Sequence, residues 1–139
     1  MNIAYFLTPK QEVESLYDDN TFRKGLEFMR QKSYSVVPVT TRENIYVGSV
    51  SISDFLWYMY DNEIDEQGNV STKNVNGVLI KDIMRPESPS AVSITAELDE
   101  LLEAIMQKNF VPVVDARGAF IGIVTRHSML EYLKTQNAQ

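Results

Sequence analysis

The strongest constraint on this chain is a stretch that occurs twice. Phe120–Ser128 is an apolar strand with an internal glycine that ends in hydroxyl-bearing residues, and Tyr46–Asp54 has the same design. Each copy follows a shorter apolar strand that contains a proline. Three landmark residues recur at one interval of 74 residues, and the matched pairs are Pro38 and Pro112, Gly48 and Gly122, and Ser51 and Thr125. A shared interval for three residue types indicates internal duplication.

Both halves of the chain predict the same order of elements: helix, strand, helix, strand, strand, helix. Helical or alternating apolar spacing, capping residues and prolines give the boundaries. In the first half we expect helices at Ile3–Leu7, from the caps in Asp18–Thr21 to about Lys32, and from Ser53 or Asp54 to about Tyr60, with strands at Glu12–Tyr17, Tyr34–Val39 and Tyr46–Val50. In the second half we expect helices at Leu79–Met84, Ala96–Lys108 and Arg126–Lys134, with strands at Ala91–Ile94, Val111–Val114 and Phe120–Val124 around a turn at Asp115–Gly118.

The domain organisation follows from the polar stretch at the midpoint. We divide the chain into a first repeat, residues 1–62, an acidic and polar linker, residues 63–76, and a second repeat, residues 77–139. Pro9 and Pro86 are 77 residues apart. The second copy has therefore lost about three residues, which we place near the end of its long helix. Each half is of marginal size alone, so we expect an α+β fold with two pseudo-symmetric repeats packed into one compact domain.

The composition excludes several classes of function. A net charge of −6 disfavours sequence-independent nucleic-acid binding, and no apolar run approaches the length of a membrane span. The chain has no cysteine and one histidine, which excludes thiol chemistry and multi-histidine metal sites. It also lacks a Walker-type phosphate-binding run and a nucleophile–base pair. We therefore expect a cytoplasmic protein that is not an enzyme and has no catalytic or metal-ligating residues.

The repeated pattern resembles a pair of CBS repeats, the Bateman module. The resemblance covers nearly the whole chain and depends most on Gly48–Asp54 and Gly122–Ser128, which follow a glycine, apolar residues, a hydroxyl residue and a final acid. Ser49 is a polar departure from this pattern, and Ser128 stands where the acid is expected. The chain is most similar to stand-alone bacterial CBS-pair proteins, some of which bind adenine nucleotides including cyclic di-AMP.

The resemblance implies a regulatory module that senses an adenine nucleotide, with no other cofactor, in two clefts between the repeats. The first cleft would contain Val13, Tyr34, Ser35, Val36, Thr125, Arg126, His127 and Ser128. The second would contain Ala91, Val92, Asn109, Phe110, Val111, Ser51, Ser53 and Asp54. In the second, Asp54 would accept the ribose hydroxyls but has no cation adjacent in sequence. In the first, Arg126 would offset phosphate charge, so a phosphate-rich or cyclic dinucleotide would suit it better.

Several of these residues also have a purely structural interpretation. Ser51, Ser53, Asp54 and Thr125 are residue types that cap helices whatever the function. A lone histidine early in a helix, such as His127, is more typical of an exposed or packed position than of a functional one. Tyr34 and Phe110 are equally compatible with a place in the core. Apolar residues in excess of a small core (Trp57, Tyr58, Tyr60, Met129, Leu130 and Leu133) would form the homodimer face found in the family, or extra core. A structural dimerisation adaptor without a nucleotide is therefore the alternative to a sensor that signals to a protein partner.

Overall fold

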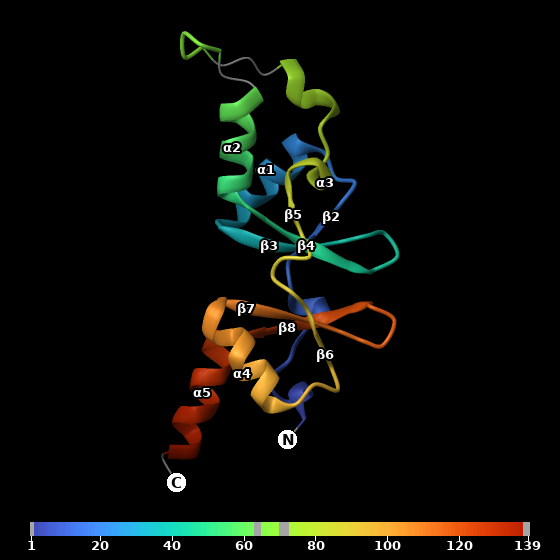
Figure 1. The fold of residues 1–139 in the computed structure, drawn as a ribbon, viewed down its shortest axis with the longest axis vertical. Helices are drawn as coiled ribbons and strands as arrows, with labels where there is room; N and C mark the ends of the chain where they lie inside the picture. The colour runs from blue at the N-terminus through green and yellow to red at the C-terminus, as the bar shows by residue number, and fades with distance from the viewer. Residues whose placement is uncertain (1, 63–64, 70–72, 138–139) are drawn as a thin grey trace. The chain divides into compact units, whose positions relative to one another are not determined.

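The structure, a computed structural model, describes residues 2–62, 65–69 and 73–137 (Figure 1). The α-helices are α1 (Phe22–Lys32), α2 (Ile52–Asn62), α3 (Ile80–Ile83), α4 (Leu98–Gln107) and α5 (Arg126–Asn137), and the 3₁₀ helices are η1 (Ile3–Phe6), η2 (Lys10–Glu12) and η3 (Lys73–Gly77). The strands are β1 (Thr8–Pro9), β2 (Leu16–Tyr17), β3 (Val36–Thr40), β4 (Tyr46–Ser51), β5 (Arg85–Pro86), β6 (Val92–Ser93), β7 (Phe110–Val114) and β8 (Phe120–Thr125). The predicted mixed α+β class is confirmed.

The chain folds as two compact units whose sheets have equivalent topology. Unit 1 comprises Met1–Glu14, Asn44–Tyr46 and Pro89–Gln139, and unit 2 comprises Ser15–Glu43 and Val47–Ser88. One sheet has the order β1-β8-β7-β6 and the other β2-β3-β4-β5. The first strand of each half therefore pairs in the sheet of the other half, so the folded units do not coincide with residues 1–62 and 77–139. The edge strands β1 and β5 were not predicted, because a strand of two residues that ends in a proline is too short to show an alternating pattern.

The two sheets repeat the same contacts. The parallel pair β2–β3 matches Leu16 with Val39, and the parallel pair β6–β7 matches Val92 with Val113. The antiparallel pair β4–β5 matches Gly48 with Pro86, as β1–β8 matches Gly122 with Pro9. Prolines are tolerated at such sheet edges, because an edge strand leaves one side of its backbone unpaired. Internal duplication therefore describes the folded units as well as the sequence.

The residues lost from the second copy can be placed. The caps of the long helices, Thr21 for α1 and Glu97 for α4, are 76 residues apart, and the interval falls to 74 beyond these helices. Ser33 ends α1 in a left-handed conformation with φ 57°, whereas α4 passes directly into an extended residue, Lys108. Two of the three residues are thus lost at the helix end, as predicted, and the third is lost earlier.

Each unit buries its own core beneath its helices. In unit 2 the core contains Phe22 and Met29 from α1, Val37 and Val39 from β3, and Phe55 from α2. In unit 1 the corresponding residues include Leu101 and Ile105 from α4, Val111 and Val113 from β7, and Met129 from α5. The apolar residues at helical spacing in α1 and α4 therefore form the buried faces of these helices.

Two predicted strands are shorter than expected. Glu12–Tyr17 contains the end of η2 and only the two-residue strand β2, and Ala91–Ile94 contains only β6. The predicted turn at Asp115–Gly118 is confirmed, because Asp115 Oδ1 accepts hydrogen bonds from the backbone N–H groups of Arg117 (2.8 Å) and Ala119 (3.0 Å). These bonds to the charged form lower the pKa of Asp115.

The predicted linker, residues 63–76, is partly core. Val75 in η3 is buried together with Val78, and both pack in the core of unit 2. Asp65 closes a short turn by accepting from the N–H groups of Gln67 and Asn69, which lowers its pKa. Residues 63, 64 and 70–72 lie outside the described residues. No helix in the described part of the chain has the length and apolarity to cross a membrane.

Candidate functional site

The first candidate site, the Asp54 junction, is the point in unit 2 where β4 passes into α2. The Oγ of Ser51 accepts from the backbone N–H of Asp54 (3.2 Å), and Oδ2 of Asp54 accepts from the N–H of Ser51 (2.8 Å). This reciprocal pair satisfies two backbone donors that the helix leaves free at its start. The Oγ of Ser53 lies 2.8 Å from that of Ser51. Ser51 and Asp54 therefore cap the start of α2, and this role uses Oδ2 of Asp54.

The second carboxylate oxygen of Asp54 faces a cation. Its Oδ1 lies 3.2 Å from Nε of Arg85, with the Asp54 side chain 9% exposed and that of Arg85 60% exposed. Arg85 reaches this position because β5 pairs with β4 and sets it opposite Ser49. Sequence reasoning missed Arg85, which is 31 residues from Asp54. The signal that could have found it is its place before Pro86, in register with Thr8 before Pro9.

Residues predicted for different clefts lie together at this junction. The backbone N–H of Ile52, at the start of α2, donates to the carbonyl oxygen of Ser35 at 2.9 Å. The neighbouring side chains of Tyr34 and Val36 are exposed. Tyr34, Ser35 and Val36 were predicted for the first cleft, whereas Ser51, Ser53 and Asp54 were predicted for the second. Unit 2 thus holds three of the eight residues of each predicted set.

The equivalent Thr125 junction of unit 1, where β8 passes into α5, has Ser128 at the position of Asp54. The Oγ1 of Thr125 accepts from the N–H of Ser128 (3.0 Å), and the two hydroxyl oxygens are 2.8 Å apart. The N–H of Arg126 donates to the carbonyl oxygen of Asn109 at 2.9 Å, repeating the Ile52–Ser35 contact 74 residues later. Phe110 pairs with Thr125 across β7–β8. The backbone contacts of the junction are therefore the same in both units, but the charged pair of Asp54 and Arg85 is present only in unit 2.

The guanidinium of Arg126 binds the end of a neighbouring helix. Its Nε and Nη2 donate to the carbonyl oxygen of Ile105, and Nη2 also lies within hydrogen-bond distance of the carbonyl oxygens of Met106 (3.3 Å) and Lys108 (3.2 Å). A cation here satisfies free carbonyls and complements the negative end of the α4 dipole. His127 is exposed, with Nε2 3.4 Å from Oε1 of Glu131 on the next helical turn. Arg126 therefore has a structural role at this junction.

The remaining predicted residues of unit 1 contribute mainly backbone. Val92 and Val111 are buried in the core, which leaves only their main chains to meet a ligand. Ala91 is half-buried and lines a pocket of about 250 Å³ with residues of α4. Val13, at the end of η2, and Phe110 are also half-buried. Each predicted cleft combines five residues of unit 1 with three of unit 2, so the grouping of these residues into two clefts stays a prediction.

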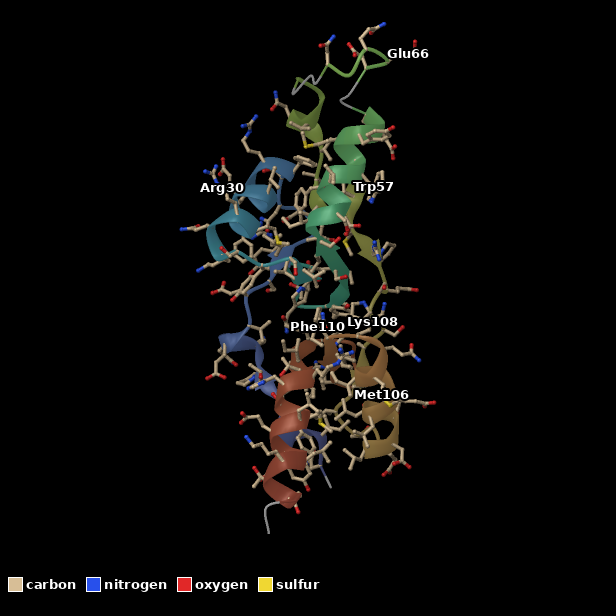
Figure 2. All side chains as sticks on the ribbon, turned by 90° about the vertical axis from the view of Figure 1, so that its left-hand side faces the viewer. Arg30, Trp57, Glu66, Met106, Lys108 and Phe110 are labelled. Atoms are coloured by element: carbon tan, nitrogen blue, oxygen red, sulfur yellow. The ribbon has the colours of Figure 1, made fainter. Side chains whose placement is uncertain are left out.

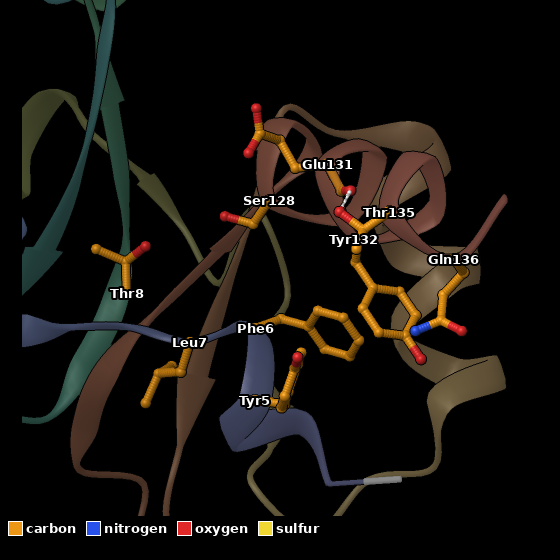
Figure 3. Close-up of a pocket in the computed structure, with 9 residues that line it drawn as sticks. All are labelled: Tyr5, Phe6, Leu7, Thr8, Ser128, Glu131, Tyr132, Thr135 and Gln136. Carbon is orange, nitrogen blue, oxygen red and sulfur yellow. Dashed lines mark hydrogen bonds between the residues drawn. The ribbon is translucent and has the colours of Figure 1, made fainter. Parts of the chain in front are cut away.

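A second pocket lies beside the Thr125 junction (Figure 3). It has a volume of about 370 Å³ and is lined by Tyr5, Phe6, Leu7, Thr8, Ser128, Glu131, Tyr132, Thr135 and Gln136. Phe6 and Tyr132 meet edge to face with ring centroids 4.8 Å apart. Thr8 and Ser128 are the counterparts of Arg85 and Asp54, so hydroxyl groups replace the ion pair. In the described part of the chain, no group of three or more metal-ligating side chains is found.

Comparison with known proteins agrees with the repeated fold. The family model of the CBS domain matches residues 6–61 and again residues 80–135. These two matches together span most of the chain. The chain belongs to the CBS-domain family and carries two copies of the domain.

Its curated relatives include a plant protein and an archaeal enzyme. The chloroplastic CBS domain-containing protein CBSX2 of Arabidopsis thaliana is 26% identical over 147 residues, which cover 92% of this chain and 61% of CBSX2. A second curated relative, a homoserine O-acetyltransferase of Methanococcus vannielii, is 23% identical over 140 residues, which cover 91% of this chain and only 25% of the enzyme. This chain therefore spans less than two thirds of either relative.

Solved structures share the fold over the whole chain. A CBS domain protein from Streptococcus pneumoniae has a TM-score of 0.85 at 27% identity, covering 98% of this chain and 88% of its own. CBSX2 in complex with AMP has a TM-score of 0.75 at 26% identity, covering 98% of both chains. CbpB in complex with c-di-AMP has a TM-score of 0.85 at 24% identity, covering 97% of this chain and 85% of its own.

Proposed function

We propose that this protein is a regulatory module that senses an adenine nucleotide: AMP, ADP, ATP or cyclic di-AMP. The observation that carries the proposal is the Asp54 junction, where one carboxylate oxygen caps the helix and the other makes a single contact with the exposed side chain of Arg85. The AMP bound to CBSX2 and the c-di-AMP bound to CbpB support the ligand class.

The chemistry of the junction suits such a ligand. Oδ1 of Asp54 can accept a ribose hydroxyl, since its second oxygen is already committed to the helix cap. The first turn of α2 offers free N–H groups and the positive end of the helix dipole, which favour an anion. The exposed ring of Tyr34 can stack on a base. The proposal retains the two predicted ligand-binding sets, but Val92, Val111 and Arg126 would contact the ligand through their backbone rather than their side chains.

A ligand series tests the proposal directly. The midpoint of thermal unfolding is measured with AMP, ADP, ATP and cyclic di-AMP, and with GMP as the control for the base. A ligand at 100 times its dissociation constant stabilises the folded state by about 2.7 kcal/mol. We expect a rise of several degrees for at least one adenine nucleotide and a smaller rise for GMP. The absence of any shift with all four adenine nucleotides would refute the proposal.

The signalling part of the proposal follows from linkage. A nucleotide that binds one conformation better than another shifts their populations, and a protein partner that distinguishes them receives the signal. We propose a homodimer in the cytoplasm with such a partner, and we assign no catalysis, nucleic-acid binding or membrane binding to the chain. The match to the acetyltransferase covers too little of that enzyme to transfer its activity.

The second candidate function is a dimerisation adaptor without a nucleotide. It is favoured by exposed apolar side chains on α2 (Leu56, Trp57 and Tyr60) and on α5 (Leu130 and Leu133). Trp57, which is 58% exposed, projects from α2 in Figure 2. Light scattering on the wild type and on Trp57→Glu tests for a dimer that depends on this face. A dimer combined with no nucleotide-induced thermal shift would select the adaptor.

A further inference from the structure

We propose that Arg85 is the specificity-determining residue of the Asp54 junction, and that it makes the site select nucleotides over nucleosides. In the free protein Arg85 pairs with Asp54. When a nucleotide binds, its ribose takes the place of the guanidinium on Asp54, and the released guanidinium binds the phosphate. This inference rests on the proposed function.

The backbone of Arg85 is fixed, whereas its side chain is not. Arg85 pairs with Ser49 in the β4–β5 ladder, and the backbone carbonyl oxygen of Arg85 lies against Gly48. The side chain, in contrast, is 60% exposed and reaches Asp54 through a single Nε contact of 3.2 Å. Asp54 is largely buried, but the Arg85 guanidinium is open to solvent and makes only one contact with it, so the pair is weaker than a buried bidentate pair. The guanidinium can therefore leave Asp54 when another hydrogen-bond donor, such as a ribose hydroxyl, takes its place on the carboxylate.

The ribose and Arg85 compete for one oxygen. Oδ2 of Asp54 is held by the N–H of Ser51, so Oδ1 is the oxygen available to a ribose hydroxyl, and Oδ1 is where Nε of Arg85 lies. No described residue accepts a hydrogen bond from Nη1 or Nη2 of Arg85. These two NH₂ groups of the planar guanidinium can donate a pair of parallel hydrogen bonds to one phosphate group. A nucleotide restores an anionic partner to the displaced guanidinium, and a nucleoside does not.

The other arginine predicted near a ligand is less suited to this exchange. Arg126 directs its guanidinium at backbone carbonyls at the end of α4, and its release would leave those carbonyls without a donor. The counterparts of Arg85 and Asp54 in unit 1 are Thr8 and Ser128, which carry no charge. The exchange is therefore a property of the Asp54 junction.

Calorimetry on the full chain with AMP and adenosine tests the inference. We expect the dissociation constant of the wild type for AMP to be at least about tenfold lower than that for adenosine. This is the difference expected from one hydrogen bond between charged groups. In Arg85→Gln this preference should fall close to one. The affinity for adenosine should stay equal or rise, because its competitor for Asp54 is gone. Arg85→Lys, which keeps the charge without the fork, should retain part of the preference.

The matched control is Arg42→Gln. Arg42 is an equally exposed arginine of unit 2 whose Nε lies 2.9 Å from Oδ1 of Asp19, and it is absent from the proposed site. It should leave the preference for AMP unchanged. The inference is overturned by an Arg85→Gln preference equal to that of the wild type, or by an equal loss of both ligands. A wild type that binds neither ligand overturns the proposed function itself. Should Arg85→Gln fail to fold, a wild-type preference in Arg85→Lys would overturn the inference.

Discussion

Gly48 lies against the backbone carbonyl oxygen of Arg85 so closely that no Cβ atom fits between them. Its φ of +145° is also a conformation that residues with side chains rarely adopt. Gly122 repeats both features against the carbonyl oxygen of Thr8, with a φ of +154°. The glycine that identifies each repeat in the sequence is therefore the residue against which the short edge strand, β5 or β1, packs its backbone.

Gly48→Ala should destabilise unit 2 strongly. The added methyl group meets backbone atoms, which cannot move aside as a side chain would, and the alanine must also adopt a strained φ. We expect the free energy of unfolding in urea to fall by about 2–4 kcal/mol. Gly77→Ala, in the same unit, is the control because its Cβ would meet nothing within 4 Å and its φ carries no strain. Equal losses for the two variants would contradict this explanation.

Asp54→Asn should separate capping from ligand binding. The asparagine side-chain oxygen can still accept from the N–H of Ser51, but the negative charge in the first turn of α2 and the pair with Arg85 are lost, so the free energy of unfolding should fall by about 0.5 to 1 kcal/mol. The same change removes the charged acceptor for a ribose, and the affinity for AMP should fall about tenfold or more. Ser51→Ala is the reciprocal control, since it removes the cap and should cost about 1 kcal/mol of stability. Undiminished AMP affinity in Asp54→Asn would argue that Asp54 is only a cap.

Tyr46 should make the protein sensitive to alkali. Its hydroxyl donates to the carbonyl oxygen of Pro89 at 2.7 Å, and burial raises its pKa above the ordinary value of 10.0. Since the folded state holds this proton more tightly than the unfolded state, the contribution of Tyr46 to stability is constant below about pH 10 and falls as the pH rises above it. Tyr46→Phe should lose about 1–2 kcal/mol at neutral pH. Melting curves between about pH 8 and pH 11 should then show a shallower alkaline decline in Tyr46→Phe than in the wild type.

Arg126→Gln should affect stability more than ligand affinity. The change removes the cation that binds the last carbonyls of α4, which should cost about 1 kcal/mol in urea unfolding. The affinity for AMP should change by less than about threefold, well below the effect of one charged hydrogen bond. A tenfold loss of AMP affinity with unchanged stability would instead support the phosphate-binding role predicted from its position after Thr125.

The sequence predicted those parts of the fold that depend on local patterns. The matched prolines and glycines gave the duplication, and apolar spacing gave the long helices and the strands around the Asp115 turn. The short edge strands were missed because Thr8–Pro9 and Arg85–Pro86 have too few residues to show a period. Val75 was assigned to the linker because one apolar residue in a polar stretch does not reveal that it is buried.

The same limit applies to the candidate site. Ser51, Asp54 and Thr125 were found because capping is a local property of three or four consecutive residues. Arg85 was missed because its contact with Asp54 depends on the pairing of β5 with β4, which is a long-range property. Arg126 was assigned to phosphate from its neighbours in sequence, whereas its contacts come from a helix about twenty residues earlier.

The exchange of β1 and β5 between the two halves has a consequence for any attempt to divide the protein. A fragment of residues 1–62 lacks the strand that borders β4, and a fragment of residues 77–139 lacks the strand that borders β8. Each fragment would expose an open strand edge, which invites aggregation or recruitment of the missing piece. Each fragment carries the edge strand that the other lacks, so the two fragments can complement each other. A single copy of the repeat would need either a second molecule or its own first segment to complete its sheet.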